Sequence, residues 1–326
     1  MRAWQVHELG EPAEVLRLDD VEPLEPGERE VVVAVEACAV NFADSLLCRG
    51  TYQESPPLPF TPGMEVAGTV VATGPGAMHP IGARVVGTPL LPRGGLAEQA
   101  AARSVDVFPL PPSLPSSEAA AMHVSYQTGW FALHRRAGLR AGETVLVHAG
   151  AGGVGSAAVQ LAKAAGATVV ATAGGPDKVA RCLELGADHA VDHRADDFVA
   201  SVLDLTDGRG ADVVYDAVGG DTFQRSTRCI AWEGRILVIG AAGGAYAEAR
   251  TNHAMVKNYS IMGVNWGGYR TRRPELVHEA HDDIVRLYAE GAVRPLVSEV
   301  LSLDALPDAL GRLVAGATTG KIVLTP

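Results

Sequence analysis

The sequence has few cysteines and no long hydrophobic run. The four cysteines, Cys38, Cys48, Cys182 and Cys229, are scattered without a close C-x-x-C pair, so neither a disulfide framework nor a structural zinc cluster is expected. Apolar stretches such as residues 31–40 are far shorter than the roughly 20 residues that cross a bilayer. No basic segment followed by an apolar run opens the chain. We therefore expect a cytoplasmic protein with inert, buried thiols.

Positive charge is also in short supply. The chain has 27 Lys and Arg residues against 38 Asp and Glu residues, a formal net charge of −11. This balance excludes bulk electrostatic attraction to nucleic acid or to anionic membranes, so any cation that binds a phosphate has to be local. With 326 residues, 47% of them hydrophobic, the chain exceeds what one hydrophobic core usually serves, and we expect two domains.

The first third of the chain alternates short β-rich runs with glycine and proline. Runs typical of strands occur at residues 30–37, 66–72, 84–87 and 105–108, and they predict a compact β-rich barrel. A proline-rich stretch, residues 109–115, then ends regular structure, and a helix with a serine N-cap is predicted from Ser116. We place a domain boundary close to residue 120.

The most informative stretch is TVLVHAGAGGVGSAAVQLAK, residues 144–163. A short β-branched run turns through Gly150, Gly152 and Gly155 into a helical pattern, which gives G-x-G-x-x-G between a strand and a helix. These glycines allow a tight turn, a close approach of the backbone to a pyrophosphate and close packing of helix on strand, with the phosphates at the helix N-terminus. The stretch therefore predicts a dinucleotide site.

From Thr144 onward the chain repeats strand and helix in units of roughly thirty residues, the rhythm of a doubly wound parallel sheet. Further strands are expected at residues 168–172, 190–192, 212–216, 235–239 and 259–263. Their Val and Ile content suits strands that are covered on both faces. The final segment differs, with a helix at residues 275–289 and a strand from Lys321, and we expect it to rejoin the first domain.

The order of these elements resembles the medium-chain dehydrogenase/reductase superfamily, and most closely its zinc-free quinone oxidoreductase branch, the zeta-crystallin-like proteins. The similar segments are ACAVNFAD (37–44), PGMEVAG (62–68), GGLAE (94–98), HAGAGGVG (148–155), YDAVG (215–219) and GVNW (263–266). The resemblance implies an α/β fold with two domains. One is a GroES-like catalytic domain, residues 1–120 completed by 266–326, and the other is a Rossmann dinucleotide-binding domain, residues 121–265.

Two residues separate the chain from the zinc-dependent members of the superfamily that it resembles. Those proteins carry a cysteine where Asn41 stands and a histidine where Met64 stands. A catalytic zinc needs three protein ligands of N, S or O type, and an amide with a thioether does not replace a thiolate with an imidazole. The lobe that carries four clustered cysteines is also missing, so we expect no metal.

The tip of the second strand of the parallel sheet indicates which dinucleotide binds. NAD sites usually place Asp or Glu there, on the ribose 2′-OH, whereas this chain has alanine and glycine at residues 173–174. Lys178, His193 and Arg194 are nearby cations that can converge on a 2′-phosphate. We therefore expect NADPH in preference to NADH. Asp177, which precedes Lys178, argues against phosphate binding here, although its side chain can instead cap the helix N-terminus. The alternative for Lys178 is a solvated helix residue with no phosphate contact.

The resemblance also implies where the cofactor lies. It places Ala151, Gly152, Gly153 and Val154 at the pyrophosphate, Gly174, Lys178 and His193 at the adenosine end, and Gly240, Ala241, Ala242, Val264 and Asn265 at the nicotinamide end. Asn41 is expected beside the nicotinamide ribose. Lys321 matches a region where similar proteins have a basic residue near the cofactor, and an ordinary surface lysine is an equal alternative.

The chemistry follows from the expected absence of zinc. Without a Lewis acid to polarise an alcohol, the hydride acceptor has to tolerate charge itself, as quinones and α,β-unsaturated carbonyls do. Hydride transfer then depends on positioning and on excluding water. Tyr52 is the best candidate to donate a hydrogen bond to the acceptor oxygen, with a packing tyrosine as the equal alternative. Trp266 and Tyr269 either form an aromatic wall for a flat acceptor or pack in the core.

Three interpretations of function follow. The first is an NADPH-dependent, zinc-independent reductase of a small quinone or enone, with neither nucleic acid nor membrane as a partner. The second is reduction of an enoyl thioester, which needs a basic channel for a coenzyme A phosphate. The third is NADPH binding without turnover, for structure, sensing or RNA contact, and the acidic balance argues against RNA. A homodimer is expected, because similar proteins commonly form one through the dinucleotide domain.

Overall fold

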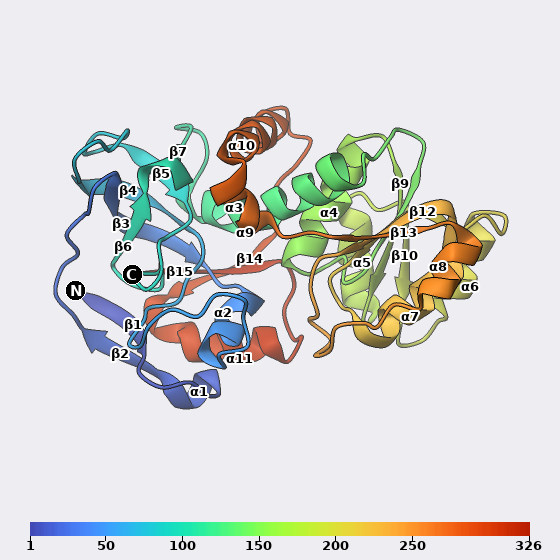
Figure 1. Cartoon of the computed structure of the whole chain (residues 1–326), viewed down its shortest axis with the longest axis horizontal. Coiled ribbons are helices and arrows are strands. Elements are labelled where there is room, and N and C mark those ends of the chain that lie inside the picture. The colour runs from blue at the N-terminus through green and yellow to red at the C-terminus, as the bar shows by residue number, and fades with distance from the viewer. The chain divides into compact units, whose positions relative to one another are not determined.

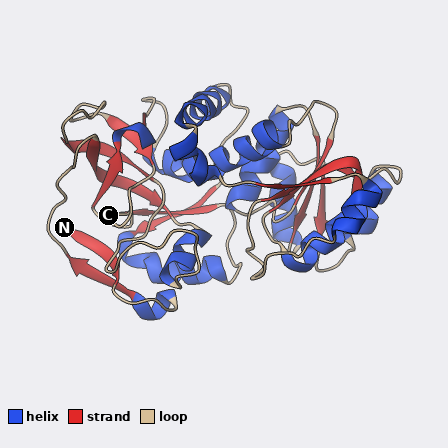
Figure 2. Cartoon of the chain, viewed as in Figure 1, coloured by secondary structure: helices blue, strands red, loops and turns tan.

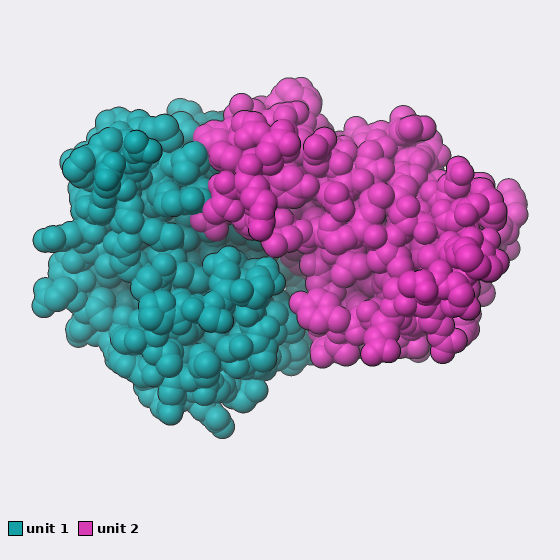
Figure 3. All heavy atoms as spheres, in the orientation of Figure 1, with its two compact units in different colours: residues 1–124, 295–326 teal, residues 125–294 magenta.

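The computed structural model describes all 326 residues, and the chain forms two compact units. Unit 1 comprises residues 1–124 and 295–326, and unit 2 comprises residues 125–294 (Figure 3). The sequence predicts boundaries after residues 120 and 265, whereas the two compact units divide after residues 124 and 294. None of the helices combines the length and the apolar character needed to cross a membrane.

Unit 1 is built on a seven-stranded sheet and a separate two-stranded hairpin. Its strands are β1 (Arg2–Val6), β2 (Leu16–Asp20), β3 (Glu30–Ala39), β4 (Val66–Thr73), β5 (Arg84–Gly87), β6 (Gln99–Arg103), β7 (Val107–Pro109), β14 (Val297–Ser302) and β15 (Lys321–Thr325). The sheet runs β14–β15–β3–β4–β5–β7, and β6 pairs with β3. β15 therefore lies between the edge strand β14 and β3, which makes the C-terminal segment an interior strand of the sheet (Figure 1).

Helices pack against this sheet through one apolar core. They are α1 (Pro12–Val15), α2 (Phe42–Cys48) and α11 (Leu306–Val314), and the chain passes from unit 1 to unit 2 within α3 (Ser116–Trp130). Leu47 of α2, Leu310 of α11 and Leu324 of β15 are buried in the same cluster. This shared core fixes the start of α2 relative to the start of β15, where two of the expected site residues lie.

Unit 2 contains a six-stranded parallel sheet in the order β10–β9–β8–β11–β12–β13. The strands are β8 (Thr144–Val147), β9 (Thr168–Ala173), β10 (His189–Asp192), β11 (Ala211–Asp216), β12 (Ile230–Val238) and β13 (Ser260–Gly263). The chain starts at the centre, moves outward to β10, then returns to β11 and moves outward on the other side. This is the order of the dinucleotide-binding fold, with its switch point between β8 and β11. The predicted doubly wound sheet is confirmed.

Helices cover both faces of the unit 2 sheet (Figure 2). They are α4 (Gly153–Ala164), α5 (Pro176–Glu184), α6 (Phe198–Leu205), α7 (Gly220–Cys229) and α8 (Thr251–Lys257). Two more helices, α9 (Trp266–Arg272) and α10 (Pro274–Ala289), follow β13. Because parallel crossovers are right-handed, reversing direction at the switch point puts α4 and α5 on one face and α6 and α7 on the other. All carboxyl ends of the strands meet at one edge, where ligands of such sheets bind.

Side-chain contacts explain why residues 266–294 belong to unit 2. The Tyr269 ring of α9 lies 4.3 Å, centroid to centroid, from the Phe131 ring of the π-helical turn Phe131–Arg136. On α10, Asp283 accepts a hydrogen bond from the Trp130 indole nitrogen at 3.0 Å. α9 and α10 are therefore attached to the helical start of unit 2 through aromatic and polar contacts.

Candidate functional site

The glycine turn between β8 and α4 leaves no room for side chains. A Cβ atom on Gly155 would lie 2.1 Å from the carbonyl oxygen of Ala149, and one on Gly150 would lie 2.8 Å from the Cβ of Ala171. Real Cβ atoms essentially never come within 3.0 Å of such neighbours. The fingerprint glycines therefore perform the roles predicted for them: Gly150 permits the tight turn and Gly155 the close packing of helix on strand.

The first turn of α4 is the accessible part of the helix. Gly152 precedes the helix with an extended backbone (φ −84°, ψ 177°), and its carbonyl accepts the first helical hydrogen bond from Ser156 N at 2.8 Å. Residues 152–154 are partly exposed, whereas residues 155–162 are buried. The N–H groups of a first helical turn have no partner within the helix, and together with the helix dipole they attract an anion. Three of the four positions predicted for the pyrophosphate, residues 152–154, are thus accessible to a ligand, whereas Ala151 is buried.

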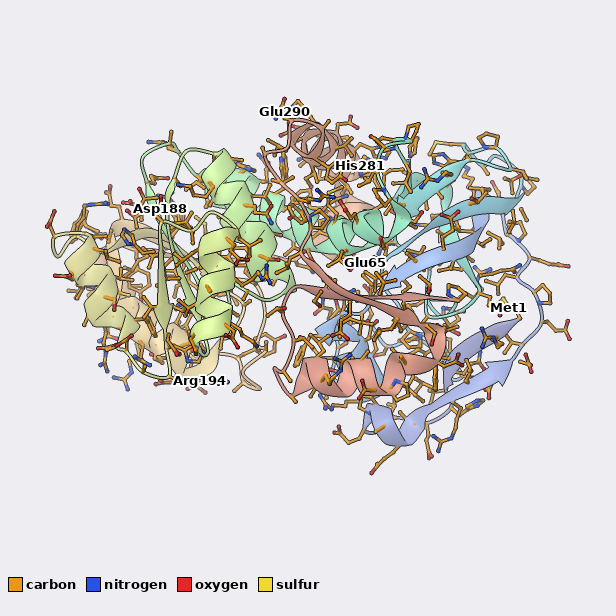
Figure 4. The ribbon with its side chains drawn as sticks, turned by 180° about the vertical axis from the view of Figure 1, so that it is seen from behind. Met1, Glu65, Asp188, Arg194, His281 and Glu290 are labelled. Carbon is orange, nitrogen blue, oxygen red and sulfur yellow. The ribbon has the colours of Figure 1, made fainter.

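Cationic side chains gather at the tip of β9. A Cβ atom on Gly174 would lie 2.9 Å from Arg194 Nε and 3.2 Å from His193 Nε2, so both side chains cover this glycine. Figure 4 labels Arg194. Burial, and next the charge of Arg194, lower the pKa of Lys178. The structure therefore places His193 and Arg194 side by side over Gly174 and Lys178 near Arg194. Binding of a 2′-phosphate by these three cations stays a prediction.

A carboxylate beside this cationic group is engaged in backbone hydrogen bonds. Asp192 Oδ1 accepts from Gly175 N at 2.9 Å and from Arg194 N at 3.0 Å, and these two contacts are the main reason why its pKa is lowered. Asp192 ends β10, one strand further out than the position of the acidic residue in NAD sites. It ties the tips of β9 and β10 together and so holds Arg194 over Gly174.

The residues expected at the nicotinamide end lie after β12 and β13. Ala242 N donates to Ala217 O at 3.0 Å, and Val264 N donates to Val238 O at 3.1 Å. These contacts hold residues 240–242 and residues 264–265 at the carboxyl ends of the strands, on the edge that carries the glycine turn. Asp216 caps the adjacent turn, since its Oδ1 accepts from Val218 N and Gly219 N, each at 2.9 Å.

A buried histidine lies beside the glycine turn. His148 follows β8, and its ring nitrogens contact Thr172 Oγ1 at 2.9 Å and Ser226 Oγ at 2.8 Å. The ring also packs edge-on against Phe198, with centroids 4.9 Å apart. Burial lowers the pKa of His148 to about 3. It is therefore neutral at physiological pH and joins β8, β9 and α7.

Unit 1 contains a buried polar cluster assembled from Asn41, Glu65 and Lys321 (Figure 4 labels Glu65). The Lys321 ammonium lies 2.8 Å from Glu65 Oε1 and donates to Asn41 Oδ1 at 2.6 Å. Asn41 Nδ2 donates to Glu65 Oε1 at 2.9 Å and to Ala39 O at 3.0 Å. Glu65 is 0% exposed and Lys321 is 5% exposed. The alternative of an ordinary surface lysine at Lys321 is therefore wrong.

A second carboxyl group, that of Asp44, holds the backbone of Asn41. Asp44 Oδ2 accepts from Asn41 N at 2.8 Å, and Asp44 Oδ1 accepts from Gly63 N at 3.0 Å. Complete burial raises the pKa of Asp44 to about 6, against the effect of these two N–H donors. The start of α2 is thus tied to the turn that precedes Met64 and Glu65.

The aromatic candidates divide between packing and partial exposure. Trp266 is buried, and its indole nitrogen donates to Gln127 Oε1 at 2.9 Å, so it is a core residue rather than part of a wall. Tyr269 is half-buried on Phe131. Tyr52 is half-buried and its ring packs against the unit 1 core. Packing is therefore observed for Tyr52, and donation from its hydroxyl to an acceptor stays a prediction.

Comparisons with known proteins agree with this architecture. Residues 27–112 match the family described as alcohol dehydrogenase GroES-like domain, and residues 153–282 match the family described as zinc-binding dehydrogenase. Quinone oxidoreductase-like protein 2 of Bos taurus is 38% identical over 326 residues, covering 99% of this chain and 92% of that protein.

Solved structures show the same fold. The quinone oxidoreductase of Escherichia coli, solved in complex with NADPH, superposes with a TM-score of 0.93 at 31% identity and full coverage of both chains. The quinone oxidoreductase of Pseudomonas syringae pv. Tomato gives a TM-score of 0.93 at 33% identity, covering 100% of this chain and 99% of that one. The α/β architecture with a GroES-like domain is thereby confirmed.

The residues present do not fit a catalytic zinc, although one matched family is described as zinc-binding. No three His, Cys, Asp or Glu side chains of the chain are grouped so that they could hold a metal ion. Asn41 and Glu65 are bound to the Lys321 ammonium, which would repel a divalent cation. Burial, followed by the charges of Asp44 and Glu65, raises the pKa of the Cys38 thiol far above its usual value, whereas a metal ligand has to be a thiolate.

Proposed function

The chain belongs to the quinone oxidoreductase branch of the medium-chain dehydrogenase/reductase superfamily, and we propose that it is an NADPH-dependent oxidoreductase that works without zinc. We propose that its acceptor is a small quinone or an α,β-unsaturated carbonyl. The family supports oxidoreductase chemistry, and the preference for the cofactor and for the acceptor rests on the residues of the two units.

The observation that carries the cofactor preference is the cationic group over Gly174. Arg194 and His193 cover this glycine, and the charge of Arg194 acts on Lys178. A neighbouring carboxylate, Asp192, is held by backbone N–H groups. A guanidinium and an ammonium are the groups that proteins use to bind phosphate. The tip of β9 therefore favours binding of a ribose 2′-phosphate, whereas a 2′-hydroxyl makes weaker hydrogen bonds there and adds less to the affinity.

The remaining cofactor contacts follow the carboxyl edge of the unit 2 sheet. When bound, NADPH supplies the hydride. The partly exposed N–H groups of Gly153 and Val154 bind the pyrophosphate at the start of α4. Residues 240–242 and 264–265 line the nicotinamide end. The backbone hydrogen bonds of Ala242 and Val264 hold these segments in place before the cofactor arrives, and such preorganisation is what hydride transfer requires.

Residues of unit 1 then orient the reactants. We propose that Asn41 accepts a hydrogen bond from a ribose hydroxyl of the cofactor, and that the Tyr52 hydroxyl donates to the acceptor oxygen as charge develops there. Because the side chains around Asn41 do not fit a zinc ion, a saturated alcohol or ketone lacks an electrophile to polarise it. A conjugated acceptor spreads the incoming charge over its own oxygen and needs no metal.

The cofactor assignment is tested by fluorescence titration of purified protein with NADPH and NADH. We expect NADPH to bind about tenfold tighter, because two or more charge-assisted hydrogen bonds to the 2′-phosphate are lost with NADH. Equal affinities for the two cofactors would refute the role of the cationic group.

The reaction assignment is tested by NADPH oxidation with a panel of benzoquinones, naphthoquinones, alkenals and enoyl thioesters. We expect turnover with quinones or alkenals that persists after exhaustive chelation. Turnover confined to enoyl thioesters would favour the thioester reductase instead. NADPH binding without turnover of any acceptor would favour a non-enzymatic role, and loss of activity on chelation that zinc restores would refute the zinc-free mechanism.

We also propose that the protein forms a homodimer through the β13 edge of the unit 2 sheet. β13 is the outermost strand and is mostly exposed, so its backbone groups are available to pair with another strand. Large apolar side chains are exposed on this strand and on the preceding α8: Met255 (71%), Val256 (66%) and Ile261 (37%). A monomeric mass in light scattering at micromolar concentration would contradict this assembly.

A further inference from the structure

The Asn41 amide lies between two groups of opposite polarity. Its oxygen accepts from the Lys321 ammonium at 2.6 Å, and its nitrogen donates to Glu65 Oε1 at 2.9 Å. Turning the amide by half a rotation would place its NH2 group against the ammonium and its oxygen against the carboxylate. Both contacts would then join groups of like polarity in a site that is almost closed to water, where such mismatches are costly.

The fixed orientation also limits what Asn41 offers to a ligand. An asparagine amide has two N–H donors and one acceptor oxygen, and both donors are engaged by Glu65 Oε1 and Ala39 O. Any further hydrogen bond that Asn41 makes is therefore accepted at Oδ1. The side chain is partly exposed, and a hydroxyl is a ligand group that can donate to such an acceptor.

We propose that Lys321 and Glu65 are positioning residues that lock the Asn41 amide with its oxygen toward the ligand, which makes Asn41 a selective acceptor for a sugar hydroxyl. Glu65 is itself held by a hydrogen bond from Val124 N at 2.6 Å, and Asp44 fixes the Asn41 backbone. Both the partner of the Asn41 amide and the Asn41 backbone are thus held by further hydrogen bonds. This inference rests on the proposed function, since it takes the hydroxyl to be one on the nicotinamide ribose of NADPH.

The test compares two ligands by equilibrium titration. NADPH contains the nicotinamide ribose, whereas 2′,5′-ADP contains only the adenosine end with its 2′-phosphate. Lys321→Met removes the cation that holds the amide oxygen and so weakens the orientation of the amide, and we expect NADPH to bind about tenfold more weakly, the loss of roughly one hydrogen bond. The affinity for 2′,5′-ADP should stay within about twofold of wild type. With a quinone acceptor, the KM for NADPH should rise in the same proportion while kcat changes little.

A second variant guards against misfolding, because Lys321→Met leaves the buried Glu65 carboxylate without its cation. Lys321→Met/Glu65→Gln removes both charges, a change that buried ion pairs often tolerate, and it should show the same selective loss of NADPH affinity. Lys163→Met, which breaks the ion pair with Asp188 in unit 2, is the matched control and should bind both ligands as wild type does.

The possible outcomes separate this inference from the proposed function. Wild-type NADPH affinity in either folded variant overturns the positioning role, and so does an equal loss of NADPH and 2′,5′-ADP. Wild-type protein that binds neither ligand overturns the proposed function, and this inference with it. Selective loss of NADPH affinity in both variants, with the control unchanged, supports the lock.

Discussion

The neutral, buried His148 makes the stability of unit 2 depend on pH. Its pKa falls from 6.5 to about 3 on folding, because burial disfavours the charged imidazolium. The unfolded chain therefore binds a proton below pH 6.5 that the folded chain does not bind, and this favours unfolding. The stabilisation from the neutral ring is fully present above pH 6.5 and is lost progressively as the pH falls from 6.5 toward 3.

The size of the effect follows from the pKa difference. Between about pH 7.5 and pH 5, the unfolded His148 becomes protonated over about 1.5 pH units, which corresponds to about 2 kcal/mol of lost stability. Gln in place of His148 keeps a polar group between Thr172 and Ser226 but does not titrate. We expect His148→Gln to be less stable than wild type at neutral pH, and the stability gap to narrow by about 2 kcal/mol at pH 5.

Urea unfolding at a series of pH values, followed by tryptophan fluorescence, measures this gap. Three of the four tryptophans, Trp130, Trp232 and Trp266, are in unit 2, so the signal reports mainly on the relevant unit. Phe198→Leu is the control, because it loosens the same packing without removing the imidazole and should lower stability at every pH. Wild-type and His148→Gln curves that stay parallel from pH 7.5 to 5 would refute the reasoning.

Three further predictions concern the cofactor site and the assembly. Gly155→Ala should weaken NADPH binding at least about tenfold in titration, because its Cβ would lie 2.1 Å from Ala149 O; Gly311→Ala, where nothing lies within 4 Å of the new Cβ, should bind normally. Arg194→Ala should reduce the ratio of NADPH to NADH affinity about tenfold, and an unchanged ratio of dissociation constants would show that Arg194 does not contact the 2′-phosphate. Ile261→Lys should convert the dimer to a monomer in light scattering by placing a charge on the β13 edge, and a variant that remains dimeric would locate the interface elsewhere.

Local sequence patterns predicted strands well where short β-rich runs alternate with glycine and proline. The strand expected at residues 84–87 is β5 (Arg84–Gly87), and the one expected at 66–72 is β4 (Val66–Thr73). The glycine turn was also predictable, because its geometry depends on residues adjacent in the chain. The unit to which residues 266–294 attach was not, since it depends on contacts such as Trp130 with Asp283 and Phe131 with Tyr269, which no local pattern encodes.

The site residues show the same division. Lys178, His193 and Arg194 could be named as nearby cations from their positions after the second and third strands, whereas the contact of His193 and Arg194 with Gly174 depends on the directions of their side chains. A lysine near the end of a chain usually lies at the surface. The burial of Lys321 depends on the position of β15 between β14 and β3 and on a carboxylate that lies far away in the sequence. In the sequence, the only sign of a buried partner for Lys321 was the acidic residue Glu65, next to Met64.

The placement of β15 has a consequence for how the protein matures on the ribosome. Residues 1–124 emerge first and can begin to collapse while unit 2 is still being synthesised, since chains commonly fold from the N-terminus during translation. Glu65 has no cation until Lys321 leaves the exit tunnel with the last strand of the unit. Until then the buried Glu65 carboxylate has only hydrogen-bond donors such as Asn41 Nδ2 and Val124 N, and a buried charge without a counter-ion is costly. Insertion of the final strand neutralises that charge, fixes Asn41 and closes the sheet in one late step.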